Sequence, residues 1–332
     1  MTTPALAALR RACPNAAITY VVDEPYRELV EGHPALQRII RLPRKLSAAE
    51  FLRRIKPLRR TKYDIVIDLH SGPRASLLTG FCRAGLKVGY KIRYRHVFYD
   101  VKVARKPPSG HVHSVENHIS AIKAAGIPVS SIPPLSMAPE LDAEKMKVRA
   151  FMTQFGLSNR AFLVLHIGAG NRFREWGTKN LIEFIDILDE RTSFPVVLIG
   201  ASEDLTSAET ILRTCRKPPF SLVGRLGLRE LRHLIELSRI FVGPDSGPMH
   251  IAATTSTPIA AYFGPTLPAH FAPWKAKHVV IEKDIPCRPC RQTACVTNDF
   301  RCIRGITAEE VFKACLPFLR APSSPPPSTQ GV

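Results

Sequence analysis

Acidic residues and long apolar runs are scarce in this chain. Its 332 residues include 28 Asp and Glu against 47 Lys and Arg, which gives a formal net charge of +19. No segment approaches the roughly 18 to 20 apolar residues that a membrane-spanning helix needs. The start of the chain, Met1 to Pro4, lacks the charged leader and apolar stretch of a secretory signal. We therefore expect a cytoplasmic protein whose charge attracts polyanions such as nucleic acid, an anionic membrane surface or phosphorylated substrates; a solvated basic surface is the alternative.

Signatures of nucleic-acid-binding modules are also absent. Basic residues cluster at 38–60 and 87–106, and aromatic residues interleave the second cluster. No zinc-finger, RRM or KH pattern accompanies them. We therefore favour a phosphorylated or membrane-embedded partner and expect no nucleic acid; a basic nucleic-acid-associated protein is the weaker alternative.

A dinucleotide-binding fingerprint is incomplete. After Gly168 and Gly170 its third glycine would stand at position 173, where the chain has Phe173. The pattern therefore gives little support to a nicotinamide-dependent dehydrogenase.

Short β-branched runs alternate with amphipathic helical patterns, which predicts βαβ units and mostly parallel sheets. Strands are expected at 18–22, 65–69, 162–165, 196–199, 240–242 and 259–263. Helices are expected at 47–60, 113–125, 143–155 and 228–237, and another should begin at about residue 178. A last helix should begin at Thr307, where Thr307 and Glu310 can form a capping box. A connection with four prolines at 128–139 separates two Rossmann-like domains, expected at 1–140 and 141–320 with a cleft between them. The Pro- and Ser-rich tail 321–332 is expected to be disordered.

The strongest signal for a ligand site is the segment 241–253, Phe-Val-Gly-Pro-Asp-Ser-Gly-Pro-Met-His-Ile-Ala-Ala. An apolar strand ends in a tight turn, and a helix begins at once. Free backbone N–H groups at such a helix start favour an anion such as a diphosphate. Alternatively, Asp245 or Ser246 caps the helix, and His250 is a histidine at the edge of the core.

This segment resembles the Asp-[Ser/Thr]-Gly-x-Met-His-x-Ala-Ala signature of glycosyltransferase family 9, the bacterial heptosyltransferase group. Segments 63–70, 88–90, 113–116, 166–170 and 257–266 resemble other parts of that family in its order, and the similarity runs from Thr2 to about Leu319. The resemblance implies a GT-B fold, with an acceptor-side domain first and a donor-side domain second. It also implies inverting transfer of heptose from an ADP-activated donor to the lipopolysaccharide inner core or another glycolipid acceptor, with no cofactor required for catalysis. The acceptor would lie at the inner membrane surface, to which the protein would bind peripherally.

The resemblance also implies donor-site residues. These are Asp245, Ser246, Gly247, Met249 and His250. Arg174 stands where the family usually has a lysine that pairs with phosphate, and its alternative role is a solvated surface arginine. Asp204 stands where the family has an acid that can hold ribose hydroxyls. Neighbouring Glu203 is an alternative candidate for that role, and either residue could instead be a charge that stabilises a helix N-terminus.

Eight cysteines without a secretory signal argue against a disulfide scaffold. Four of them lie within 16 residues and resemble a cysteine pattern frequent near the family's C-terminus: Cys287, Cys290, Cys295 and Cys302. They could hold a structural zinc ion, or less readily an iron–sulfur cluster. Reduced structural thiols are the alternative, because the second half of the pattern lacks the usual zinc-ribbon spacing.

The N-terminal region departs from the family. The family opens with an apolar strand and Gly-Asp before a Thr-Thr-Pro-like turn, whereas this sequence begins at that turn with Thr2-Thr3-Pro4. The missing aspartate is the expected general base, and the resemblance gives Asp68, on a neighbouring strand, no catalytic role. We expect an enzyme whose reading frame starts upstream or, alternatively, a donor-binding form without chemistry. A gap should lie beside the strands at 18–22 and 65–69.

Overall fold

The chain folds into two units, which we describe separately. The computed structural model describes residues 1–105 and 112–320, so the tail 321–332 lies outside the described residues. Unit 1 is Met1–Ala138 and unit 2 is Pro139–Val332. The division falls at the end of the proline-rich connection and close to the predicted boundary after residue 140. Within the described ranges, every helix is too short or too polar to cross a membrane.

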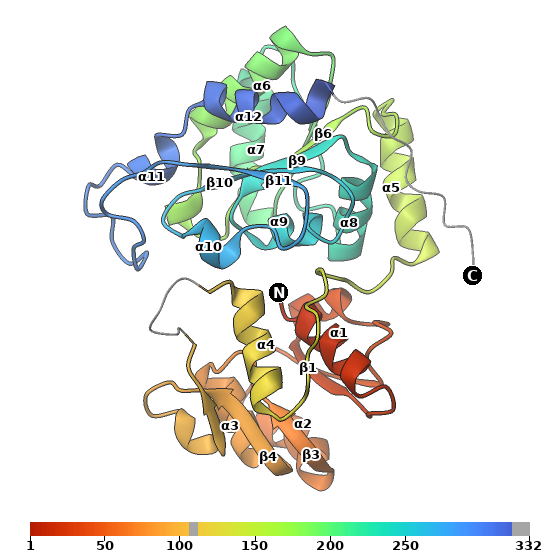
Figure 1. Ribbon diagram of the computed structural model, residues 1–332. Coiled ribbons are helices and arrows are strands. Elements are labelled where there is room, and N and C mark those ends of the chain that lie inside the picture. Colours follow the sequence, from red (N-terminus) through yellow and green to blue (C-terminus); the bar gives the residue numbers. More distant parts are fainter. Residues whose placement is uncertain (106–111, 321–332) are drawn as a thin grey trace. The chain divides into compact units, whose positions relative to one another are not determined.

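Unit 1, coloured red to yellow in Figure 1, contains two small parallel sheets. Its elements are α1 (Thr3–Ala12), β1 (Thr19–Asp23), η1 (Glu24–Leu29), β2 (Arg38–Leu42), α2 (Ala48–Arg60), β3 (Lys62–Ile67), α3 (Pro73–Phe81), β4 (Arg83–Tyr90), η2 (His96–Phe98), β5 (Val101–Val103) and α4 (Ser114–Ala124), where η marks a 3₁₀ helix. One sheet has the order β1-β2 and the other β3-β4-β5. Within the described part of the chain, β1 and β3 thus each keep one edge without a strand partner. The predicted strands at 18–22 and 65–69 lie in separate sheets.

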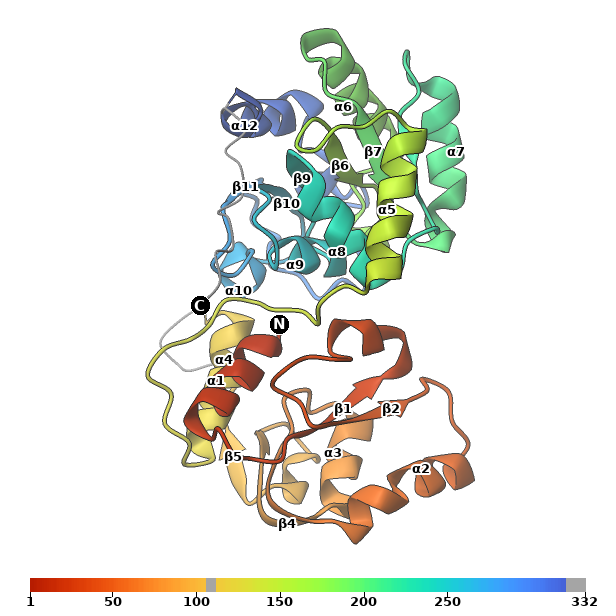
Figure 2. The ribbon, with the colours of Figure 1, turned by 90° about the vertical axis from the view of Figure 1, so that its right-hand side faces the viewer.

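Unit 2, green to blue in Figures 1 and 2, contains one parallel sheet of six strands. Its elements are α5 (Asp142–Gln154), β6 (Leu163–His166), η3 (Arg172–Arg174), α6 (Thr178–Arg191), β7 (Val196–Ile199), η4 (Ser202–Asp204), α7 (Leu205–Thr214), β8 (Phe220–Ser221), α8 (Leu228–Leu237), β9 (Ile240–Pro244), α9 (Gly247–Ala252), β10 (Ile259–Phe263), α10 (Pro268–Phe271), β11 (His278–Glu282), α11 (Arg301–Arg304) and α12 (Ala308–Arg320). The strand order is β11-β10-β9-β6-β7-β8. The chain therefore winds outward from β6 in one direction and from β9 in the other.

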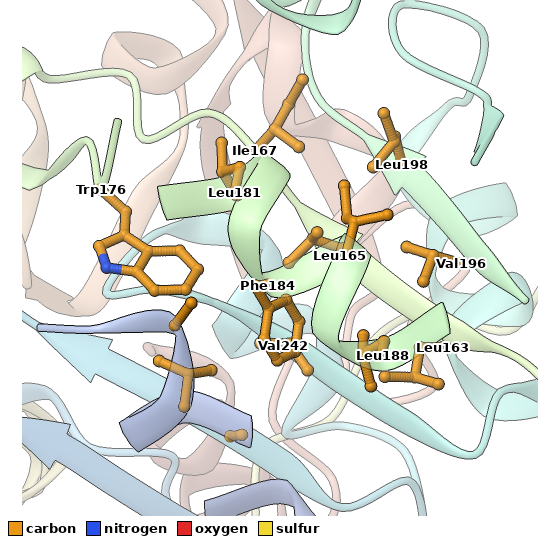
Figure 3. Close-up of a cluster of buried hydrophobic side chains, with 14 of the residues drawn as sticks. Leu163, Leu165, Ile167, Trp176, Leu181, Phe184, Leu188, Val196, Leu198 and Val242 are labelled. Carbon is orange, nitrogen blue, oxygen red and sulfur yellow. The ribbon is translucent and has the colours of Figure 1, made fainter. Parts of the chain in front are cut away.

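The main core of unit 2 packs α6 against one face of this sheet. Alternate residues of β6 point to the same face, where Leu163 and Leu165 meet Phe184 and Leu188 of α6 (Figure 3). All four side chains are fully buried. Each such burial contributes about 1.5–3 kcal/mol, so the core holds β6 and the turn that follows it firmly in place.

Helix α12 completes the same core through Val311 and Phe312. It begins at the predicted capping box, in which the hydroxyl of Thr307 accepts the backbone N–H of Glu310 at 3.2 Å. In return, the Glu310 carboxylate accepts the backbone N–H of Thr307 at 2.7 Å. This sequence prediction is confirmed.

Candidate functional site

The candidate site lies at the carboxyl ends of β6 and β9. These strands are neighbours and pair in parallel. The strand order changes direction between them, and ligands of open α/β sheets bind at such switch points. Ser246, just after β9, joins His166, the last residue of β6, with 3.1 Å between Oγ and Nδ1. The sheet itself therefore brings the two predicted loops, 166–170 and 245–250, together.

Ser246 does not cap α9 with its side chain, although it is the residue before the helix. Its hydroxyl donates to the carbonyl of Pro244 at 3.1 Å. A carbonyl only accepts, so both hydrogen bonds of Ser246 are satisfied when Nδ1 of His166 carries the imidazole proton. Burial lowers the pKa of His166 to about 4, which makes this ring neutral at physiological pH.

Asp245 is fixed from several sides and is only 3% exposed. Its backbone N–H donates to the carbonyl of Tyr262 at 3.2 Å. The hydroxyl of Thr266 donates to its Oδ2 at 2.6 Å, and Nη1 of Arg174 lies 3.5 Å from the same oxygen. Burial raises the pKa of Asp245, while Thr266 and Arg174 oppose that shift. Asp245 therefore acts as a buried anchor that holds the Arg174 guanidinium at the turn.

Arg174 is a partly exposed cation at this anchor, with 27% of its side chain accessible. Nη1 also donates to the backbone carbonyl of Asp245 at 3.2 Å, and Nε donates to Oε1 of Gln292 at 3.0 Å. Its Nη2 group forms no hydrogen bond with any residue that the structure describes. Two N–H groups of a positioned guanidinium thus remain for an anion, which favours a binding role over that of a solvated surface arginine.

Asp204 lies beside the loop that follows β6. It is half-buried at the end of η4, and its Oδ2 accepts the backbone N–H of Ala201 at 2.8 Å. A Cβ on Gly168 would come within 2.1 Å of this carboxylate, and one on Gly200 within 2.7 Å. The two glycines therefore make room for Asp204, whereas Glu203 is exposed. Of the two rivals, the geometry gives Asp204 the place beside the 168–170 loop.

The remaining predicted residues lie on the six-residue helix α9. At Gly247 an added Cβ would meet no atom within 4 Å, so the start of this helix borders open space. His250 is half-buried on the first turn. Met249 is fully buried and has a core position beneath the turn. Its side chain therefore supports the site from within.

The four clustered cysteines line one small cavity together with Phe173 and Phe300. They are free thiols. The pKa of Cys302 is raised by burial and by the other three thiols, whereas a hydrogen bond with Thr297 lowers the pKa of Cys295 to about 7. In residues 1–105 and 112–320, no three His, Cys, Asp or Glu side chains are placed to hold a metal ion. The four sulfurs thus line one cavity but are not placed to coordinate a common metal ion. The structural zinc ion stays a prediction.

Asp68 in unit 1 has a structural role. It is 5% exposed, and its Oδ1 accepts the backbone N–H groups of His70 and Ser71 at 2.9 and 2.7 Å. Its Oδ2 accepts the hydroxyl of Tyr99 at 2.7 Å. These bonds hold Ser71 in the left-handed region, at φ 53°. The carboxylate is occupied in building this turn, so the structure adds no support for Asp68 as a general base.

His166, Thr266 and Gln292 had no predicted role in the site, although His166 and Thr266 stand in segments that resemble the family, 166–170 and 257–266. His166 and Thr266 could have been found, because each follows a buried apolar run whose carboxyl end faces the switch point. Gln292 carries no local signal. It reaches Arg174 across 118 positions of the sequence.

A model of glycosyltransferase family 9 (heptosyltransferase) matches residues 51–300, which is well over half of the chain. The chain belongs to glycosyltransferase family 9. It is therefore a glycosyltransferase, and the family expected from the 241–253 segment is confirmed.

Individual relatives agree with this family assignment. Lipopolysaccharide heptosyltransferase 3 of Escherichia coli K12 is 28% identical over 283 residues, which cover 82% of this chain and 81% of the relative. The crystal structure of a family 9 glycosyltransferase from Veillonella parvula covers 96% of this chain and 92% of its own, with a TM-score of 0.86 at 23% identity. E. coli heptosyltransferase WaaC, solved with ADP, gives a TM-score of 0.68 at 20% identity over 96% of this chain and 95% of its own. The GT-B fold predicted from the resemblance is confirmed.

Proposed function

We propose that this protein transfers a heptose from ADP-heptose to a lipopolysaccharide core acceptor, and that the switch-point site of unit 2 binds the donor. The observation that carries the proposal is the guanidinium of Arg174, anchored on buried Asp245 with two N–H groups left over. A nucleoside diphosphate presents the anionic oxygens that such a group binds. The structural neighbour WaaC was solved with ADP, which supports this choice of nucleotide.

Each residue at the site has a proposed role. Arg174 holds the diphosphate and stabilises its charge as the bond to the sugar breaks. Asp204, beside the loop after β6, accepts hydrogen bonds from the ribose hydroxyls. In an inverting transfer the acceptor oxygen attacks the anomeric carbon while a base takes its proton, and ADP leaves with the bonding electrons. Positioned cations can neutralise that leaving group, so the proposed reaction requires no metal.

The first prediction tests Arg174 by calorimetry with two ligands. Arg174→Ala should weaken ADP binding roughly ten- to a hundredfold, because hydrogen bonds to charged groups contribute about 1.5–3 kcal/mol. Adenosine has no diphosphate, so its affinity should change little. Arg172→Ala removes an exposed arginine from the same short helix and serves as the matched control. Equal losses for ADP and adenosine would remove Arg174 from the diphosphate site.

A donor-binding role without transfer is the second candidate, because the contacts of Arg174 and Asp245 support binding of a donor and assign no base for the transfer step. Both candidates require ADP binding, so only turnover separates them. Release of ADP from ADP-heptose in the presence of a lipopolysaccharide core acceptor, above the rate without acceptor, supports transfer. ADP binding without acceptor-dependent release supports the second candidate.

A further inference from the structure

The cysteine segment, residues 287–302, lies against the donor site at several points. Oε1 of Gln292 accepts Nε–H of Arg174 at 3.0 Å and Nδ2–H of Asn171 at 2.9 Å. The backbone N–H of Cys290 donates to the carbonyl of Pro265 at 3.2 Å, and Nη2 of Arg288 donates to the carbonyl of Thr266 at 2.9 Å. Thr266 in turn holds Asp245. One segment therefore contacts Arg174 directly and also contacts Thr266, the residue that holds Asp245.

The chemistry of these contacts fixes how Gln292 is oriented. Oδ1 of Asn171 accepts the backbone N–H of Phe173 at 3.0 Å, so the other end of the Asn171 side chain must be the NH₂ group. Nε of Arg174 is also a donor only. The Gln292 atom that meets both must therefore be its carboxamide oxygen, and both of its lone pairs are used.

The guanidinium is consequently held at two edges. Gln292 takes Nε–H on one edge, and the carbonyl of Asp245 takes Nη1–H on the other. A planar group held at two points keeps one orientation, and preorganised donors bind an anion without first losing rotamer entropy. The Nη2 group, which has no partner among the described residues, is thereby turned to a fixed direction.

We propose that Gln292 is a positioning residue of the donor site, which orients Arg174 for the donor diphosphate. This inference rests on the proposed role of Arg174. Gln292 acts through Arg174 and contacts no reacting atom. The cysteine segment thus contributes to donor affinity as well as to the core of unit 2.

The substitution that tests this role is Gln292→Gly. Gln292 has φ +59°, which glycine adopts without strain, so the variant loses the carboxamide without a backbone penalty. Asn298 is the matched control: it lies in the same segment at φ +60° and is exposed. Asn298→Gly should therefore bind ADP as the wild type does.

The measurement is a double-mutant cycle with Arg174→Ala, read by calorimetry with ADP and with adenosine. We expect Gln292→Gly to weaken ADP about tenfold and to leave adenosine unchanged. On the Arg174→Ala background, the same substitution should cause no further loss, because it acts through that side chain. An unchanged ADP affinity in Gln292→Gly, or a full second loss on the Arg174→Ala background, overturns the positioning role.

The two hypotheses fail in different ways. If Arg174→Ala itself leaves ADP affinity unchanged, the proposed function of the site fails, and the role of Gln292 fails with it. If Arg174→Ala weakens ADP while Gln292→Gly does not, the inference about Gln292 alone is wrong. Melting temperatures equal to that of Asn298→Gly would show that Gln292→Gly is folded.

Discussion

A single buried histidine links the two strands of the proposed donor site. His166 ends β6 and reaches Ser246 beyond β9, and it is 5% exposed. Burial lowers its pKa from 6.5 to about 4. Below pH 6.5 the unfolded chain takes up a proton at this residue and the folded chain does not, down to about pH 4. The stability that depends on neutral His166 is therefore complete above pH 6.5 and is lost as the pH falls toward 4.

We predict that His166→Asn flattens this pH dependence. The asparagine amide can take the place of Nδ1 beside Ser246 and does not titrate. Between pH 7.5 and 5, the wild type should lose roughly 2 kcal/mol more unfolding free energy than the variant. Urea unfolding at both pH values measures the difference. Burial also lowers the pKa of His118, to about 3. His118 is present in both proteins, so its contribution cancels in the difference between their unfolding free energies. Parallel pH profiles for the two proteins would contradict the prediction.

Elements with strong local periodicity were predictable from the sequence. The helix expected at 228–237 and the strand expected at 259–263 have the bounds of α8 and β10. Strand β4 was not predicted, because its sequence includes two glycines, Gly85 and Gly89, that weaken a strand pattern. The structure explains Gly89: a Cβ there would meet the ring of Tyr99 at 2.5 Å. That requirement comes from tertiary packing, and no local pattern carries it.

The residues of the candidate site were likewise predictable where one motif holds them together, and unpredictable where only tertiary packing brings them to the site. Asp245, Ser246 and Gly247 stand in one continuous segment, so a motif could predict their shared place. Gln292 belongs to the site only because the cysteine segment folds back onto η3. There the ring of Phe300 packs edge-on against the ring of Phe173, with 5.5 Å between the ring centroids. Contacts between residues more than 100 positions apart are set by the packed structure and leave no periodic signal.

For the cysteine segment, we propose that its four thiolates bind one zinc ion, which would draw together sulfurs that already line one cavity. Purified protein should then contain about one zinc equivalent per chain, and a chelator should lower its melting temperature. Cys287→Ser should lose the metal because it removes a ligand, whereas Cys13→Ser in unit 1 should retain it. Metal-free protein with the same melting temperature in chelator would support reduced structural thiols instead.

At the scale of the whole molecule, positive charge is divided unevenly. Residues 1–138 hold 23 Lys and Arg against 9 Asp and Glu, whereas residues 139–332 hold 24 against 19. Helix α2 of unit 1 exposes five cations, and in the described structure none of them forms a salt bridge: Arg53, Arg54, Lys56, Arg59 and Arg60. In unit 2, by contrast, Arg213, Arg216 and Lys217 each pair with a carboxylate. Unpaired surface cations on unit 1 favour an anionic acceptor or an anionic membrane surface as its partner.

The last prediction concerns this surface of α2. Each cation near an anionic bilayer contributes about 1 kcal/mol, so replacing Arg53, Arg54 and Lys56 together by Gln should weaken binding to phosphatidylglycerol-containing vesicles roughly a hundredfold. The matched control replaces Arg213, Arg216 and Lys217 by Gln; it removes the same charge from unit 2, where carboxylates already neutralise those cations. Cosedimentation at low and high salt measures both variants, and wild-type binding should fall as salt screens the attraction. Equal binding by the two triple variants, or equal binding of the wild type to neutral vesicles, would mean that α2 is a solvated face without a membrane role.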